Sequence, residues 1–194
     1  MDDRQPISAN EAQEALKLIE ATTRQMRRAL AHGGTPYFFL IWGTVWLLAF
    51  GSTQFLGPES PVAGLIWVVL DILGGIASFV VGWRLSLRLR GHTYGPTIGL
   101  FWLAWIVYAA LIVYFARPQS GDQLSLLVSL FAMFGYVVMG IMFRSTLIGG
   151  LGAVLTLLII AGYLLIPAYF NLWMAVLGGG SLIGVGLYIL YAWS

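Results

Sequence analysis

Six apolar runs divide the chain after residue 36, and short polar or Gly- and Pro-containing breaks separate them. Each run has about the 20 residues that a helix needs to cross the hydrocarbon core of a bilayer. The runs are apolar at consecutive positions rather than at alternate ones, which favours helices over the strands of a membrane barrel. The sequence therefore predicts six transmembrane helices, at roughly 37–56, 62–83, 97–116, 123–143, 146–166 and 169–192.

A mostly polar segment, residues 1–35, precedes the six-helix transmembrane bundle predicted for residues 36–194. Ser8 and Glu11 form an S-x-x-E capping box, in which the two side chains satisfy free backbone N–H groups at a helix start. Apolar residues then recur at helical spacing, so we expect an amphipathic helix over 8–31. This helix either lies on the membrane surface or docks onto a partner protein or a second copy of the chain.

Composition places the chain in the membrane class. Hydrophobic residues make up 59% of the 194 residues and charged residues only 9%, whereas a soluble domain carries about 25% charged residues. Such a chain cannot cover a water-facing surface, so we predict an all-α integral membrane protein. The chain has no cysteine, which excludes disulfides and cysteine-based metal sites.

The basic residues are distributed unevenly between the two sides of the predicted membrane. Of the ten Lys and Arg residues, only Arg117 falls on the side opposite the N-terminus. Short cytoplasmic loops of membrane proteins are enriched in Lys and Arg. We therefore predict a multi-pass protein of a bacterial-type inner membrane, with both termini in the cytoplasm.

Two stretches sixty residues apart resemble each other. "RALAHGGTPYFFLIW" (28–42) and "RLRGHTYGPTIGLFW" (88–102) share Arg, His, Pro, Leu and Trp at the same five places. This similarity indicates an internal repeat, in which three diverged two-helix hairpins span 37–83, 97–143 and 146–192. Internal repeats occur in many transporter folds but do not by themselves establish transport.

Two groups of basic residues precede the first and third predicted spans. Within each group the residues are four apart, so they share one helical face. Guanidinium groups bind phosphate in a bidentate manner, so these faces are candidates for anionic lipid headgroups or a partner protein. The alternative is that they only set the orientation of the chain. The residues concerned are Arg24, Arg28 and His32 in the first group, and Arg84, Arg88 and His92 in the second.

Asp71 is the most informative single residue, because it lies nine residues into the second predicted span, roughly 13 Å deep at 1.5 Å per residue. A lone charge there costs at least about 2.5–3.5 kcal/mol. Trp67, Gly74 and Gly75 lie one turn away, with Ser78 and Gly82 beyond them, and this stripe of small and polar residues suits contact with another helix. Asp71 is therefore either a carboxylate for protons or a cationic solute, or a buried residue whose hydrogen bond fixes helix packing.

Aromatic and small residues extend this picture. Trp46, Trp67 and Trp105 lie deeper than an interfacial aromatic belt, and indole rings beside a carboxylate suit a lipophilic cation; ordinary helix packing is the alternative. Gly180 and Gly184 form a small-xxx-small pair, which closes the bundle or builds a homo-oligomer.

No P-loop, G-x-S-x-G or H-E-x-x-H motif occurs. We therefore expect neither catalysis nor a cofactor, metal ion or nucleic-acid partner. The favoured hypothesis is a small membrane protein that binds or transports a lipophilic or cationic solute or protons through Asp71. The alternative is a non-catalytic membrane subunit or regulator that binds a partner protein or anionic lipid through its basic cytoplasmic face.

Overall fold

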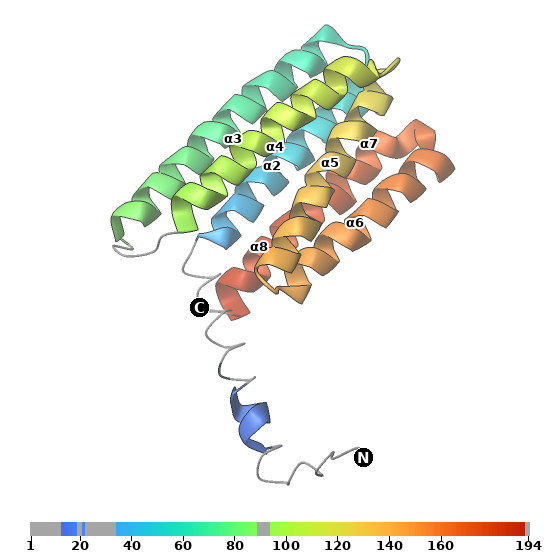
Figure 1. Cartoon of the computed structure of the whole chain (residues 1–194). Helices are drawn as coiled ribbons and strands as arrows, with labels where there is room; N and C mark the ends of the chain where they lie inside the picture. The colour runs from blue at the N-terminus through green and yellow to red at the C-terminus, as the bar shows by residue number, and fades with distance from the viewer. Residues whose placement is uncertain (1–12, 19–20, 22–33, 89–93, 193–194) are drawn as a thin grey trace.

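The computed structural model describes residues 13–18, 21, 34–88 and 94–192. Within these residues the chain is all helical and contains no strand (Figure 1). Six helical segments are long and apolar enough to cross a membrane, as the hydrophobic pattern predicts. The fold is therefore that of a helical bundle compatible with a multi-pass membrane protein.

The helices begin and end close to the predicted bounds. The sixth segment is composite, because a 3₁₀ turn and a π-helical stretch precede its last helix. The elements are α2 (Thr35–Leu56), α3 (Pro61–Arg88), α4 (Tyr94–Ala116), α5 (Gly121–Met142), α6 (Thr146–Leu165), η1 (Pro167–Tyr169), α7 (Phe170–Trp173), η2 (Met174–Gly179) and α8 (Gly180–Ala192).

The connection between α5 and α6 consists of residues 143–145. Arg144 takes a left-handed φ of 48°, and the Ser145 hydroxyl then accepts a hydrogen bond from the Ile148 N–H at 3.4 Å. A serine at this position satisfies one of the free N–H groups at a helix start. The predicted break at Arg144-Ser145 is confirmed.

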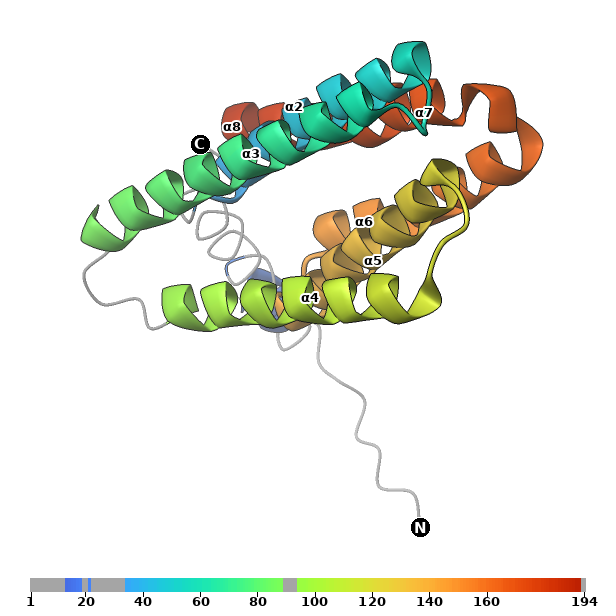
Figure 2. The same cartoon turned by 90° about the horizontal axis from the view of Figure 1, so that it is seen from above.

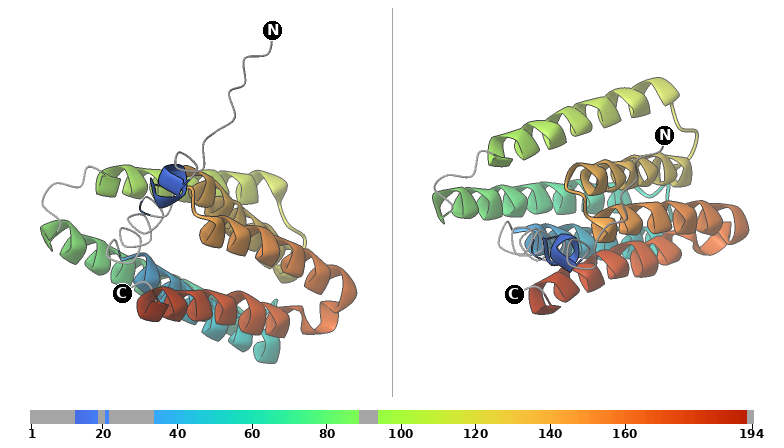
Figure 3. Two further views of the ribbon diagram at one scale, coloured as in Figure 1. Left: turned by 90° about the horizontal axis from the view of Figure 1, so that it is seen from below. Right: turned by 60° about the horizontal axis from the view of Figure 1, so that its bottom comes forward.

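α2 is the central helix of one half of the bundle, where it packs against α3 on one side and against η2 and α8 on another. α5 and α6 form an extensive helix pair in the other half of the bundle. α3 and α4 lie at the edge of the molecule, where Figures 2 and 3 show their ribbons apart. Few residues of these two spans are consequently buried inside the bundle.

Close backbone approach holds α2 against the last span. A Cβ atom added to Gly43 would lie 2.8 Å from the Ile183 backbone nitrogen and 2.9 Å from the Gly179 oxygen. No side chain fits at such a distance, so glycine is required where the two helices cross. Next to this crossing, Phe39 of α2 stacks on Tyr136 of α5, with 5.3 Å between ring centroids, and joins the two halves of the bundle.

A second link joins the first and last spans at the distal end of the bundle, which we define as residues 54–60, 117–123 and 166–172. The Gln54 amide nitrogen donates to the Ala168 carbonyl at 3.1 Å, and its amide oxygen accepts from the Leu172 N–H at 3.0 Å. One side chain thereby satisfies two backbone groups of the turn that opens the sixth segment.

Two predictions are not decided by the described residues. Residues 13–18 and 21 are helical and exposed, and the rest of the predicted amphipathic helix over 8–31 lies outside the described residues. The predicted hairpin repeat also stays a prediction, because two of the most extensive pairings, α5 with α6 and α2 with α8, join helices of different predicted hairpins.

Candidate functional site

The carboxylate of Asp71 lies near the middle of α3, ten residues or roughly 15 Å after the helix begins. Its side chain is exposed at the surface of the chain. Among the described residues, no hydrogen bond or ion pair engages this carboxylate. An ionisable group inside an apolar helix is therefore left to interact with something outside the described residues.

Small residues flank Asp71 along one edge of α3, at spacings of three, four and seven residues that keep them on one face. A Cβ atom added to any of the three glycines would meet no other atom within 4 Å. The Ser78 hydroxyl is shielded from solvent but has no hydrogen-bond partner in the described residues. We call this edge the Asp71 stripe; it consists of Gly64, Asp71, Gly75, Ser78 and Gly82.

Trp67 shows which side of α3 faces the protein interior. Its indole N–H donates to the Thr53 hydroxyl at 3.0 Å, and its ring meets the Phe50 ring edge-on at 4.8 Å. Phe50 belongs to the buried core, so this side of α3 is turned toward the protein interior. Asp71 follows one helical turn later, and its side chain is exposed.

The other tryptophans predicted near Asp71 serve packing. Trp46 is 7% exposed, and its ring lies against Gly178 of the last span. Trp105 of α4 stacks on Phe131 at 4.4 Å and donates to the backbone oxygen of the same residue at 3.2 Å. The structure links Trp46 and Trp67 through Phe50 but places Trp105 in a separate aromatic cluster between α4 and α5.

The four glycines predicted to pack helices fall into different surroundings. Gly74 is buried, and a Cβ atom there would lie 3.0 Å from a methyl group of Val45. A Cβ atom on Gly75, Gly180 or Gly184 would meet nothing within 4 Å. Within the described residues, only Gly74 of this set is therefore needed for close approach.

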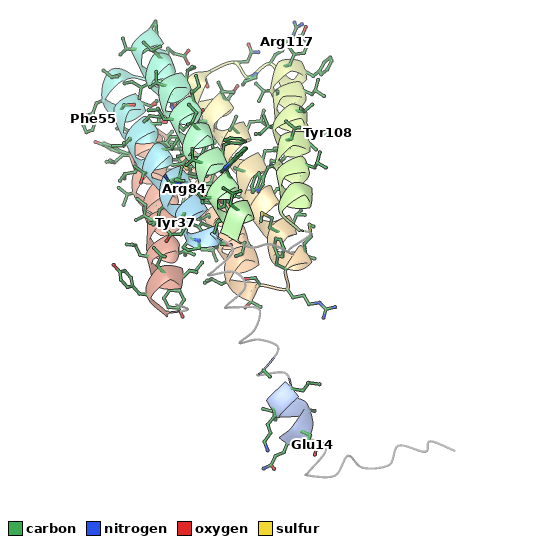
Figure 4. All side chains as sticks on the ribbon, turned by 90° about the vertical axis from the view of Figure 1, so that its left-hand side faces the viewer. Glu14, Tyr37, Phe55, Arg84, Tyr108 and Arg117 are labelled. Carbon is green, nitrogen blue, oxygen red and sulfur yellow. The ribbon has the colours of Figure 1, made fainter. Side chains whose placement is uncertain are left out.

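The predicted basic faces are described only in part. Arg84 lies near the end of α3 and is exposed, and Figure 4 shows it toward the lower end of the bundle. Arg88 is the last residue of α3, and nothing is described of its side chain. Arg24, Arg28, His32 and His92 lie outside the described residues.

A polar network at the distal end was not predicted as a site. The Glu59 carboxylate accepts from the Gly121 N–H at 2.7 Å, and the Asn171 amide nitrogen donates to Asp122 at 2.8 Å. Asn171 is 5% exposed, and its amide oxygen has no partner among the described residues. The only sequence signal for this network is that polar residues gather where apolar runs end.

No group of three or more His, Asp or Glu residues in the described parts of the chain could hold a metal ion. Comparisons of the chain with known protein families, with curated proteins and with solved structures returned no match.

Proposed function

We propose that this chain is a non-catalytic subunit of a membrane assembly, and that it binds a transmembrane helix of another protein along the Asp71 stripe. It would reside in a bacterial-type inner membrane with both termini in the cytoplasm, as the distribution of Lys and Arg favours. The observation that carries the proposal is the Asp71 carboxylate at the middle of an apolar helix, which no side chain of the described residues pairs with.

Energetics favour an external partner for this carboxylate. An unpaired charge near the bilayer centre costs at least about 2.5–3.5 kcal/mol, and ionisable residues in such positions normally pair with another group. A helix that carries a Lys, Arg, Asn or Gln at the same depth would supply the missing donor. Charge complementarity therefore selects a partner helix with such a residue.

The glycines of the stripe support the same proposal by shape. Small residues let helix backbones approach closely in lipid, where apolar side chains gain little from contact with one another. Gly64, Gly75 and Gly82 are open within this chain, so the space beside them is free for a second helix. The small residues of the stripe would let a partner helix approach closely, and the Asp71 carboxylate would set its position along α3.

A second candidate function is binding or transport of a lipophilic or cationic solute, or of protons, at the same carboxylate. It is favoured by the exposure of the Asp71 side chain and by the near absence of contact between α3 and α4, which give a small molecule access to α3. The three tryptophans give solute binding little support, because Trp46, Trp67 and Trp105 are already engaged in ring stacking or hydrogen bonds.

Bulky substitution in the stripe tests the first proposal. Gly75→Leu should reduce the mass of the assembly extracted in native lipid discs to that of the single chain, because the added side chain prevents helix approach. Gly150→Leu is the matched control, since Gly150 of α6 is equally open. An unchanged assembly with Gly75→Leu would refute helix docking, and a wild-type mass of exactly two chains would identify the partner helix as a second copy.

Asp71→Asn separates the two candidates. If the carboxylate serves a solute, purified Asp71→Asn protein in liposomes should lose solute binding or pH-dependent flux while its assembly mass stays normal. If the carboxylate serves a partner helix, the same substitution weakens the assembly, and Gly75→Leu does so more strongly.

A further inference from the structure

A groove runs between α2 and α3 on the side of α3 away from the Asp71 stripe. It is shallow and open, with a volume of about 390 Å³, and is lined by four residues of each helix, among them Leu40 and Thr44 of α2 and Leu73 and Ala77 of α3. The Thr44 hydroxyl donates to the Leu40 carbonyl at 2.8 Å, so its hydrogen-bonding capacity is satisfied inside the helix. The groove therefore presents an apolar surface to a bound molecule.

Two polar side chains stand at one end of this groove. Arg84 follows Ala77 by seven residues, so it lies two turns further along the same face of α3. Tyr37 precedes Leu40 by three residues and thus occupies the groove face of α2 one turn earlier. Both side chains are exposed, and Figure 4 shows both toward the same end of the bundle.

The charge at this end is positive. Asp71 is the one acidic residue of α3, and it lies thirteen residues before Arg84 on another face. No ion pair engages Arg84 among the described residues. The distribution of Lys and Arg assigns this end to the cytoplasmic side, where the leaflet carries anionic lipids.

The dimensions fit a lipid. At 1.5 Å per residue, the groove residues of α3 lie roughly 10–21 Å from Arg84 along the helix axis. Half of the hydrocarbon core is about 15 Å deep, so the groove lies at the depth of an acyl chain when Arg84 lies at the headgroups. An Arg guanidinium binds phosphate with two parallel hydrogen bonds, and the Tyr37 hydroxyl adds a donor.

We propose that this groove binds an anionic phospholipid of the cytoplasmic leaflet, with one acyl chain between α2 and α3 and the phosphate held by Arg84 and Tyr37. A zwitterionic lipid has a positive group next to its phosphate and therefore gains less from Arg84. The proposal concerns a different face of α3 from the Asp71 stripe and stands independently of helix docking.

Native mass spectrometry of the purified chain tests the proposal, with phosphatidylglycerol and phosphatidylcholine added in parallel. The wild-type chain should retain phosphatidylglycerol preferentially. Arg84→Gln should weaken this retention about fivefold, since a basic group near anionic headgroups contributes about 1 kcal/mol. Ala77→Phe fills the groove and should abolish retention, even though Arg84 is intact.

Two control variants carry the same kinds of substitution at positions outside the proposed lipid site. Arg117→Gln removes an exposed Arg at the opposite end of the bundle (Figure 4), and Ile76→Phe adds the same ring on a different, exposed face of α3. Both should retain phosphatidylglycerol as the wild type does. Where Ala77→Phe does not fold, Leu73→Trp fills the groove from an exposed position.

Three results would overturn the proposal. Equal retention of phosphatidylcholine would mean that the phosphate charge is not recognised. Normal retention by a folded groove-filling variant would mean that the acyl chain does not lie between α2 and α3. Equal weakening by Arg84→Gln and Arg117→Gln would mean that lipid binds by general charge alone.

Discussion

At the scale of single residues, we expect Asp71 to lower the stability of the isolated chain, and we propose that association with a partner helix offsets this cost. Transfer of an Asp to the centre of a membrane helix costs about 2.5–3.5 kcal/mol, whereas Leu is favourable by about 0.5 kcal/mol. No interaction within the described residues compensates this cost. We therefore expect its partner outside the described residues.

Asp71→Leu should consequently stabilise the separated chain and weaken its assembly. We expect the free energy of unfolding in lipid bicelles to rise by about 3 kcal/mol, from the difference between the two transfer energies. Denaturant unfolding of the purified chain measures the first effect, and the mass of the extracted assembly measures the second. A loss of stability on Asp71→Leu would instead show that the carboxylate is bonded within the fold.

At the scale of helices, the crossing of α2 with the last span depends on Gly43. Gly43→Leu should lower the free energy of unfolding by about 3 kcal/mol, because the new side chain overlaps backbone atoms that cannot move aside. Gly51→Leu on the same helix should stay within about 1 kcal/mol of the wild type, since a Cβ atom at Gly51 meets nothing within 4 Å and leucine favours helices. Thermal unfolding of both variants in detergent gives the comparison, and equal effects would contradict the crossing.

Helix positions could be predicted from the sequence because length and hydropathy are local properties. Helix contacts could not be predicted in the same way. The approach of Gly43 to Gly179 depends on two glycines 136 residues apart, and neither differs locally from the open glycines of the same helices. Gly74 and Gly75 show the same limit, because consecutive residues point about 100° apart and only one of them meets α2.

At the scale of the whole molecule, the sequence identified Asp71 but not its surroundings. The expectation of tryptophans around the carboxylate followed from depth alone, whereas the structure packs Trp105 of α4 against Phe131 and Trp46 of α2 against Gly178 of the last span. Which side chains meet depends on how the spans pair, and the hydrophobic pattern does not indicate this pairing. The groove between α2 and α3 is hidden from the sequence for the same reason, although Arg84 at its end was identified by its charge.

The link between the first and last spans gives a prediction for the whole fold. Gln54→Leu removes the two hydrogen bonds to Ala168 and Leu172 and leaves an unpaired carbonyl and N–H in the turn that opens the sixth segment. We expect faster amide hydrogen exchange over 166–173 and a loss of about 1 kcal/mol in unfolding free energy. Hydrogen-exchange mass spectrometry of the purified protein locates the effect.

Gln123→Leu is the matched control for this link, because the Gln123 side chain accepts a hydrogen bond from the Gln119 N–H at 2.7 Å within a different distal segment. Its effect on exchange should stay within 117–123. Unchanged exchange over 166–173 in Gln54→Leu would mean that helix packing alone positions the last span. A local increase would show instead that a single amide at the end of α2 holds the start of the sixth segment 114 residues later.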